Sequence, residues 1–286
     1  MGSQGSGAGR TGVRPVAGAD HRRKDFTLDQ GFDDCGATPE PLAHCHLPLP
    51  GLAAARRVPP PITAVSETCR TILFAKAPVP GQVKTRLIPA LGARGAAALA
   101  AAMLERTAAS ASEAALGPVE LCVAPSRQLP LWQELNLPPD LAWSEQGEGD
   151  LGARMARAAR RALAMGEPVL LIGMDCPALG TRQLRSAAAQ LRDHDATLLP
   201  SQDGGYVLLG LRRFEISLFE AMPWSTPVVL EQTRRRLTAA GWSWQEQPPL
   251  VDIDTPADLA SLDPHLLELA RRWAPDLIAY QTSPPE

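Results

Sequence analysis

Aromatic residues are scarce in this chain of 286 residues, at 5% of the sequence, whereas hydrophobic residues of all kinds make up 45%. Aliphatic side chains must therefore supply most of a packed core. The net charge of −3 gives no support for binding to nucleic acid or to an anionic membrane through overall charge. No apolar run approaches the length needed to cross a bilayer, so we expect a soluble protein without a membrane span.

Several sequence patterns with a known chemistry are also absent. The five cysteines form no C-x-x-C pair, and the N-terminus lacks the charged start and apolar segment of a signal peptide. Reduced thiols and a cytoplasmic location are therefore expected. The loop after the apolar run at residues 71–75 has neither the P-loop spacing G-x-x-x-x-G-K-[ST] nor the dinucleotide fingerprint G-x-G-x-x-G. It also lacks the G-x-S-x-G elbow, so a covalent nucleophile is not expected.

Residues 1–67 differ in composition from the rest of the chain. They are rich in glycine, serine and arginine at first and then in proline and alanine, without sustained apolar periodicity. Such a segment buries too little surface to offset its loss of entropy, so we expect a disordered leader. Cysteines and histidines at 35 and 44–46 match no zinc-site spacing. One domain is expected over residues 69–286.

Strand and helix patterns alternate through this domain, which predicts an α/β fold with a largely parallel sheet. Apolar runs predict strands at residues 71–75, 119–124, 141–144, 168–173, 196–200 and 206–211. Helical patterns cover residues 93–116, 150–165, 181–192, 227–240 and 264–280. Ligands of open α/β sheets bind beyond the carboxyl ends of the strands, so site residues are expected there.

The loop after the first strand combines proline, glycine and positive charge. It turns through Pro80 and Gly81 and presents four polar groups before a long helix, namely Lys76, Lys84, Thr85 and Arg86. Backbone N–H groups, the helix dipole and fixed cations together bind phosphate. The alternative is a surface loop whose lysines are merely solvated. The concentration of these groups in one loop favours phosphate binding.

Asp175 directly follows the buried strand at residues 168–173. A carboxylate at this position can bind Mg²⁺ or Mn²⁺, which take one or two protein carboxylates and complete their shell with phosphate and water. The alternative role, capping the helix near Thr181, is less favoured because Asp175 lies too far upstream. Asp252 and Asp254 would share one face if their segment is a strand, so one or both are further candidate metal ligands.

Three weaker signals complete the candidate site. Asp203, Gly204, Gly205 and Tyr206 precede a strand; they form either a hairpin turn or a contact to a sugar or acceptor, or both. A glycine-rich loop containing Gly149 and Asp150 can wrap a nucleotide, and Asp150 also suits a helix N-cap. Trp224 lies either near an acceptor or in ordinary packing.

Four ordered motifs resemble a known family. K-A-P-V-P-G-Q-V-K-T-R-L at residues 76–87, G-M-D-C-P at 173–177, D-G-G-Y at 203–206 and D-I-D-T-P-A-D-L at 252–259 are similar to motifs of the bacterial glycosyltransferase-like family of the nucleotide-diphospho-sugar transferase superfamily. Some members of that family are assigned to arsenosugar biosynthesis. The first motif also resembles phospholactate guanylyltransferases, and the last resembles sugar-acid cytidylyltransferases. The likeness covers residues 71–262.

The resemblance implies a Rossmann-like sheet of the GT-A type, a divalent metal and an activated nucleotide substrate. It also implies that Asp175 and Asp254 are the metal carboxylates. The leading hypothesis is a metal-dependent transferase with a nucleotide-diphospho-sugar donor and a small-molecule acceptor, in which Lys76, Lys84 and Arg86 bind phosphate. One alternative is a nucleotidyltransferase that releases pyrophosphate from an NTP, and a second is a non-catalytic nucleotide-binding protein. The oligomeric state is left open.

Overall fold

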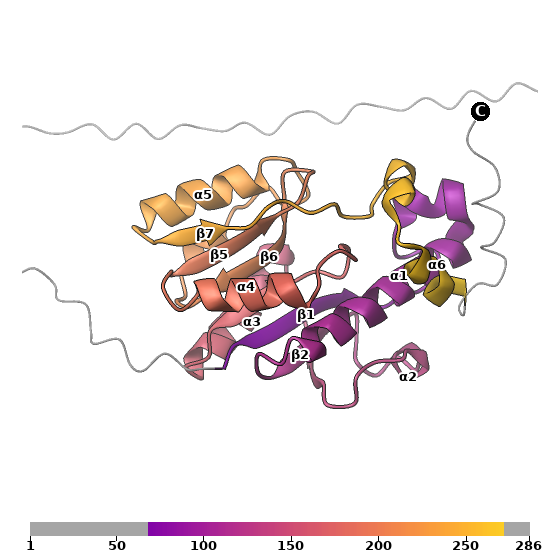
Figure 1. The fold of residues 1–286 in the computed structure, drawn as a ribbon, viewed down its shortest axis with the longest axis horizontal. Coiled ribbons are helices and arrows are strands. Elements are labelled where there is room, and N and C mark those ends of the chain that lie inside the picture. Colours follow the sequence, from indigo (N-terminus) through magenta and orange to yellow (C-terminus); the bar gives the residue numbers. More distant parts are fainter. Residues whose placement is uncertain (1–67, 272–286) are drawn as a thin grey trace, which may run out of the picture. The chain divides into compact units, whose positions relative to one another are not determined.

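The computed structural model describes residues 68–271, which contain one seven-stranded sheet flanked by helices (Figure 1). The strands are β1 (Arg70–Lys76), β2 (Val119–Ala124), β3 (Ala142–Glu145), β4 (Val169–Ile172), β5 (Ala196–Pro200), β6 (Tyr206–Leu211) and β7 (Trp244–Glu246). The α-helices are α1 (Ile88–Glu113), α2 (Leu131–Glu134), α3 (Leu151–Ala164), α4 (Thr181–Gln190), α5 (Val229–Ala239) and α6 (Pro264–Arg271). Short 3₁₀ helices are η1 (Thr85–Leu87), η2 (Ile216–Leu218) and η3 (Pro256–Ser261).

The strand order of the sheet is β3-β2-β1-β4-β6-β5-β7. β1 runs parallel to both β2 and β4, and β3 and β7 are parallel to their neighbours, whereas β6 is antiparallel to β4 and β5. The predicted α/β class with a mostly parallel sheet is therefore confirmed. Because β6 points the other way, its first residue lies at the same edge as the carboxyl ends of β1, β4 and β5.

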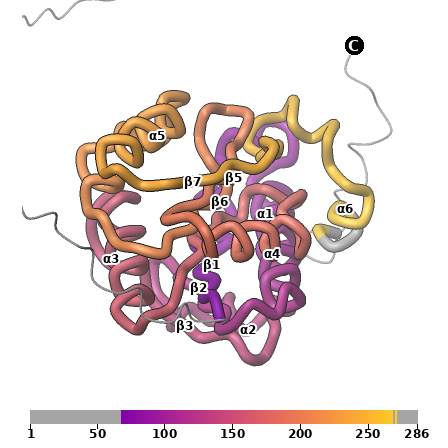
Figure 2. The backbone as a smooth tube through the Cα atoms, turned by 60° about the vertical axis from the view of Figure 1, so that its left-hand side comes forward, coloured from indigo at the N-terminus to yellow at the C-terminus, as the bar shows by residue number. Residues whose placement is uncertain are grey.

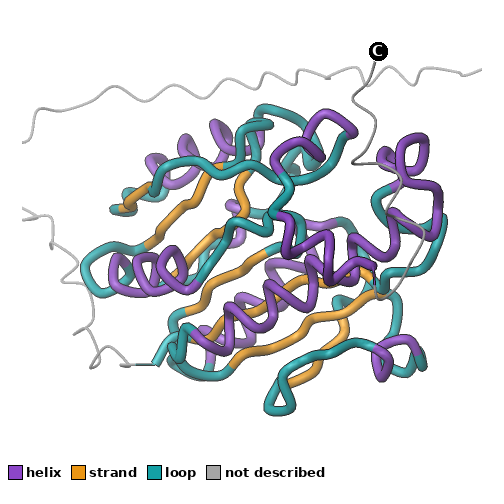
Figure 3. Tube along the Cα trace, turned by 45° about the vertical axis from the view of Figure 1, so that its right-hand side comes forward, coloured by secondary structure: helices purple, strands orange, loops and turns teal. Residues whose placement is uncertain are grey.

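Helices cover both faces of the sheet, with α1 and α4 on one face and α3 and α5 on the other (Figures 2 and 3). The strands alternate between the two cores. Leu73, Leu170 and Leu199 pack toward α1 and α4, while Ile72 and Leu171 pack toward α3 and α5. Both cores are mainly aliphatic, as the shortage of aromatic residues predicts.

Helix α1 is more apolar than the sequence analysis allowed for. By length and composition alone, the helical segment Thr85–Glu113 could cross a membrane, with a mean hydropathy of 1.6 in its most apolar window. The expectation that no run is long enough was therefore wrong. In the fold, 61% of that window is buried, and its alanines pack on the sheet. A core helix meets the same criterion, and α1 packs as one.

The segment after the sheet returns to the start of α1 (Figure 1). Ile253, Leu266 and Ala270 pack with Leu99 and Met103 of α1 in a third apolar cluster. This packing places residues 252–254 beside the loop that follows β1, far from them in sequence. The fold thereby brings the first and last sequence motifs together.

Most predicted elements are found close to their expected limits, and β2, β5 and β6 have the predicted limits. The structure adds α2 and β7, which are too short to show a clear period. Residues 251–254 do not form a strand, so the expected alternation of Asp252 and Asp254 does not apply. The predicted leader at 1–67 and the end of the helix predicted to 280 lie outside the described residues.

Candidate active site

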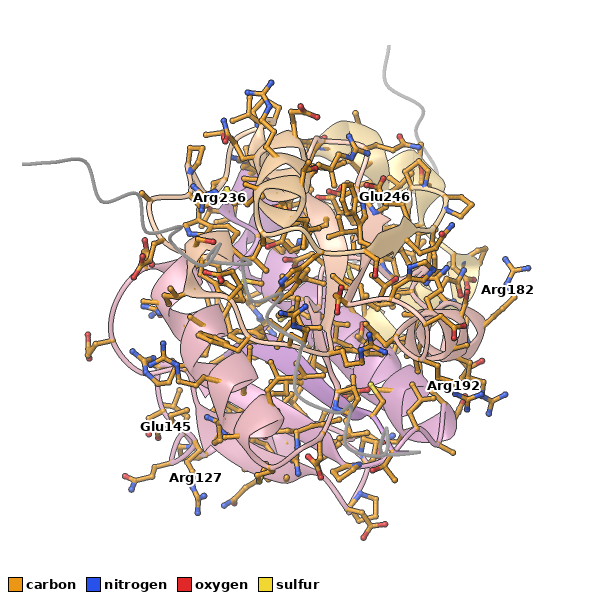
Figure 4. All side chains as sticks on the ribbon, turned by 90° about the vertical axis from the view of Figure 1, so that its left-hand side faces the viewer. Arg127, Glu145, Arg182, Arg192, Arg236 and Glu246 are labelled. Carbon is orange, nitrogen blue, oxygen red and sulfur yellow. The ribbon has the colours of Figure 1, made fainter. Side chains whose placement is uncertain are left out.

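A cavity of about 700 Å³ opens at the edge of the sheet where β1, β4 and β5 end and β6 begins. Most of the predicted site residues line it, namely Lys76, Lys84, Thr85, Arg86, Asp175, Asp203, Gly205, Tyr206, Trp224, Asp252 and Asp254. Pro80, Gly81, Gly149, Asp150 and Gly204 do not line it. Outward-pointing arginines such as Arg182 and Arg192, shown in Figure 4, are exposed and are also absent from the lining. The cavity therefore collects residues from all four motifs.

Lys84 joins the two predicted metal carboxylates. Its Nζ lies 2.6 Å from Asp175 Oδ1 and 2.7 Å from Asp254 Oδ1, and it donates a hydrogen bond of 2.7 Å to the carbonyl oxygen of Ile253. The two carboxylate oxygens are therefore no farther apart than the sum of the two ion-pair distances. We call these three charged residues the Lys84 cluster. It brings Asp175 and Asp254 within bridging distance of each other.

The backbone around the Lys84 cluster is fixed by local interactions. Lys84 has the left-handed conformation (φ 45°, ψ 43°), which is uncommon for a residue with a side chain, and its carbonyl accepts from Leu87 N–H at 2.9 Å. The Ile253 N–H donates to the carbonyl of Asp175 at 2.9 Å. These bonds connect the loop after β1, the end of β4 and the segment before η3.

A capping box holds the segment that carries Asp254. Asp258 accepts hydrogen bonds from the backbone N–H groups of Thr255 at 2.7 Å and Asp254 at 3.1 Å. Partial burial raises the pKa of Asp258, but these hydrogen bonds outweigh burial and lower it overall. Asp258 therefore has a structural role at the start of η3, and its carboxylate orients the backbone of Asp254.

The charges of the cavity shift the pKa values of its groups. Burial lowers the pKa of Lys84, but the carboxylates of Asp175 and Asp254 outweigh burial and raise it overall, so the ammonium form is stabilised. Burial and the charges of Asp203 and Asp254 raise the pKa of Asp252. Burial also raises the pKa of the Cys176 thiol to about 11. Cys176 is therefore a neutral packing residue.

Three further polar groups of the first motif face the cavity. Lys76 donates from Nζ to the carbonyl of Gln82 at 2.7 Å. Thr85 and Arg86 are exposed, and Arg86 has no ion pair or hydrogen bond within residues 68–271. An unpaired guanidinium with five donors at a cavity wall is available for a bidentate contact to a phosphate.

The Asp203 loop is the turn of a hairpin between the antiparallel strands β5 and β6, which confirms the hairpin alternative. Asp203 accepts hydrogen bonds from the Ser201 hydroxyl and from Gly205 N–H, the latter at 2.9 Å. Gly204 instead contacts the loop before α5. It has φ +88°, and a Cβ there would lie 2.1 Å from the carbonyl oxygen of Pro227. Gly204 thus permits a close backbone approach to protein rather than lining the cavity.

We predict that Gly204→Ala lowers the free energy of unfolding by about 2–4 kcal/mol, because a methyl group would combine backbone strain with overpacking. Gly241 is a matched control, since it has φ +66° but no atom within 4 Å of an added Cβ. Gly241→Ala should cost only about 1–2 kcal/mol, the strain alone. Urea unfolding measures both variants. Equal losses would show that the contact with Pro227 is unimportant.

Trp224 and the glycine-rich loop also make structural contacts within the protein. Trp224 lines the cavity, and its indole packs over Gly152 in the first turn of α3, where a Cβ would lie 2.7 Å from Nε1. Asp150 caps α3 by accepting from Ala153 N–H at 2.8 Å, as its capping alternative predicts. Thr226, in contrast, does not cap α5, because its hydroxyl donates to the carbonyl of Pro223.

Sequence reasoning did not identify Gln146 as a site residue. Its side-chain amide is buried in the cavity wall and donates to the carbonyls of Ala75 and Cys122, both at 3.1 Å. It therefore connects the ends of β1 and β2. The sequence does show that Gln146 directly follows β3, at the edge of the sheet where ligands bind. The residue type alone, however, does not distinguish a structural amide from a ligand contact.

The oxygen donors of the Lys84 cluster suit Mg²⁺ or Mn²⁺. Within residues 68–271, no group of three or more His, Cys, Asp or Glu side chains is arranged to hold a metal. Asp175 and Asp254 nevertheless are 51% and 39% exposed, and their Oδ2 atoms have no partner among these residues. Two protein carboxylates, with phosphate and water as the other ligands, match the usual coordination of Mg²⁺. The residues present therefore fit such an ion.

The fold matches a crystal structure from Desulfovibrio desulfuricans G20 whose assignment as a nucleotide-diphospho-sugar transferase is itself provisional. The two proteins share 26% sequence identity with a TM-score of 0.64, and the match covers 74% of this chain and 97% of the other. This chain therefore has the same fold as the Desulfovibrio structure. The model of a family of uncharacterized proteins conserved in bacteria (DUF2064) also matches, at residues 107–226. No curated protein matches significantly.

More distant structures have similar coverage but little sequence in common. CMP:2-keto-3-deoxy-manno-octonic acid synthetase in complex with CTP has 12% identity and a TM-score of 0.46, over 72% of this chain and 99% of its own. The 4-diphosphocytidyl-2C-methyl-D-erythritol synthase of Anaerococcus prevotii DSM 20548 has 10% identity and a TM-score of 0.47, over 69% and 95%. At these values, neither structure is informative about the site of this chain.

Proposed function

We propose that this protein is a metal-dependent transferase that uses a nucleotide-diphospho-sugar as donor and a small molecule as acceptor. The observation that carries the proposal is the convergence of Asp175 and Asp254 on Lys84, in a cavity of about 700 Å³ at the carboxyl ends of β1 and β4. Ligands of α/β sheets bind at this edge. The similarity to the Desulfovibrio structure supports a transferase.

The proposed phosphate contacts come from the loop after β1. Arg86 and Lys76 would bind the diphosphate, with Arg86 giving a bidentate contact because its guanidinium has no other partner among residues 68–271. Asp203, Gly205 and Tyr206 would contact the sugar or acceptor from the hairpin, and Trp224 would contribute an aromatic surface to the same cavity. Each of these side chains lines the same cavity.

Asp175 and Asp254 would hold the divalent cation through their solvent-facing oxygens. When bound, such a cation neutralises charge on the leaving diphosphate. The protein itself keeps both carboxylates at one side of the cavity through Lys84 and orients Asp254 through the capping box. The free, buried thiols Cys69, Cys122 and Cys176 support the further proposal that the protein acts in the cytoplasm.

A thermal-shift panel tests this function, because a ligand that binds only the folded protein raises its melting temperature. We expect one or more NDP-sugars to raise the melting temperature further with Mn²⁺ than without it. Product analysis with that donor should then show sugar transfer to an added acceptor. Stabilisation by an NTP, followed by release of pyrophosphate in the presence of a sugar phosphate or phospho-acid, would replace the proposal with nucleotidyl transfer. Binding without any turnover would indicate a non-catalytic nucleotide-binding protein.

A further inference from the structure

We infer that Lys84 is a positioning residue for the metal carboxylates: its ammonium group occupies the point between Asp175 and Asp254 and confines a divalent ion to their outward oxygens. This inference rests on the metal-binding part of the proposed function. It also changes the role of Lys84, which the sequence analysis assigns to phosphate. Three observations support this inference: the contacts of Lys84 Nζ, the burial of the side chain and the local charge balance.

The ammonium group is already held by oxygen atoms of the protein. A lysine ammonium has three N–H donors. Two hydrogen bonds of 2.7 Å run from Nζ to Asp254 Oδ1 and to the carbonyl of Ile253, and Asp175 Oδ1 forms an ion pair with Nζ at 2.6 Å. A phosphate would have to compete with the Asp175 ion pair for the ammonium group. Arg86 and Lys76 line the same cavity and are accessible without such competition.

Lys84 is also buried, with only 6% of its side chain exposed, and its backbone is held in the left-handed region. In contrast, the side chains of its two partners are 51% and 39% exposed. The ammonium therefore lies on the protein side of both carboxylates, and their Oδ2 atoms, which have no partner in the described chain, remain for an ion on the cavity side.

The charge balance of the Lys84 cluster is one positive charge against two negative charges. The cluster therefore keeps a net negative charge that attracts a cation, while the ammonium offsets the repulsion between the two carboxylates. Without that ammonium, the carboxylates of Asp175 and Asp254 would repel each other at close range, because both Oδ1 atoms lie within 2.7 Å of the position of Nζ. A divalent ion could then occupy the position that Lys84 Nζ has left and neutralise both carboxylates.

The test compares Mn²⁺ binding to the full-length wild type and to Lys84→Met, measured by the electron paramagnetic resonance signal of free Mn²⁺ without any nucleotide. Removal of a unit charge within about 4 Å of a bound cation should raise Mn²⁺ affinity about 10-fold or more. Mn²⁺ should also raise the melting temperature of Lys84→Met more than that of the wild type. In Lys84→Met combined with Asp254→Asn, both gains should disappear.

Lys76→Met is the matched control, because it removes another cavity lysine, whose Nζ has the carbonyl of Gln82 as its single partner within residues 68–271. Its Mn²⁺ affinity should change less than that of Lys84→Met. Lys84→Gln keeps N–H donors without the charge and should show the same gain as Lys84→Met. A Lys84 variant that folds only when Mn²⁺ is added supports the inference as well.

Equal or weaker Mn²⁺ binding by both Lys84 variants would overturn the inference, as would variants that stay unfolded at saturating Mn²⁺. This outcome is distinguishable from failure of the proposed function. Mn²⁺ binding is measured without donor or acceptor, so a wild type that transfers no sugar leaves the metal result unaffected. A wild type that transfers sugar while the Lys84 variants gain no affinity would reject only the positioning role.

Discussion

Asp175→Asn should lower kcat/KM for the transfer reaction about 1,000-fold or more, while the folded structure is kept. Asparagine has nearly the same shape and can still accept a hydrogen bond from Lys84, but it has no charge with which to hold a divalent ion. Losing one preorganised electrostatic contact to a developing charge typically costs about 100- to 1,000-fold in rate, and here the cation itself would be lost with it. The effect should appear in kcat as well as in kcat/KM.

The effect of Asp175→Asn on stability should be small in comparison. Asp175 is 51% exposed, so solvent screens its ion pair with Lys84, and Lys84 keeps Asp254 and Ile253 as partners. Exposed ion pairs contribute about 0–1 kcal/mol, which corresponds to a change in melting temperature of at most about 4 °C for a domain of this size. Thermal unfolding of the purified variant measures this directly.

Asp263→Asn is the matched control for Asp175→Asn. Asp263 is similarly exposed, at 45%, and pairs with Arg106 at 2.7 Å, but it does not line the cavity. Its replacement should change the melting temperature by a similar amount and leave the rate unchanged. If Asp175→Asn retained more than about a tenth of wild-type kcat/KM, Asp175 would not hold an essential cation.

The fold could be predicted because its signals are local. Alternating strand and helix patterns, glycine and proline at the ends of elements, and a continuous apolar run at β4 each depend on neighbouring residues. The position of Asp175 followed from the same logic, since a residue directly after a buried strand lies at the ligand-binding edge of the sheet. The capping role of Asp150 was also visible, because a cap lies within one turn of the residues it satisfies.

The partners of Lys84 could not be derived in this way. Lys84 and Asp175 follow the neighbouring parallel strands β1 and β4, but Ile253 lies beside them because α6 and η3 pack against α1, and that packing has no short-range signal. A cationic side chain in a loop is compatible with a phosphate or with a carboxylate partner. The resemblance to a known family indicated that Asp175 and Asp254 act together, but it did not indicate that a lysine lies between them.

For the same reason, the roles of α1 and Gly204 could not be derived from the sequence, because each depends on a contact with a segment distant in sequence. The apolar composition of α1 is typical both of a core helix and of a membrane span, and only the sheet packed against it decides between them. Gly204 was expected at a ligand because paired glycines permit a close approach. The close approach exists, but its partner is the backbone of Pro227, which is more than twenty residues away in sequence.

Arg86→Gln should weaken binding of a nucleoside diphosphate about 100-fold. Arg86 is the exposed cavity cation that has no partner among residues 68–271, and a bidentate contact to phosphate contributes about 2–3 kcal/mol. Lys84 is not expected to compensate, because its buried ammonium group already pairs with Asp175 and Asp254 and donates to the carbonyl of Ile253. Isothermal titration calorimetry with Mn²⁺ present measures the affinity, and its salt dependence should decrease in the variant.

Two further variants separate a specific phosphate contact from a general effect of charge. Arg86→Lys keeps the charge but loses the planar pair of donors, so its affinity should lie between those of the wild type and Arg86→Gln. Arg94→Gln removes an exposed arginine of α1 that does not line the cavity, and its affinity should equal that of the wild type. If Arg86→Gln and Arg94→Gln bound equally well, the diphosphate would have to contact Lys76 and the backbone of the loop after β1 instead. Lys76→Met would then show the larger loss, since Lys84, the other lysine of the described cavity wall, is buried and paired with two carboxylates.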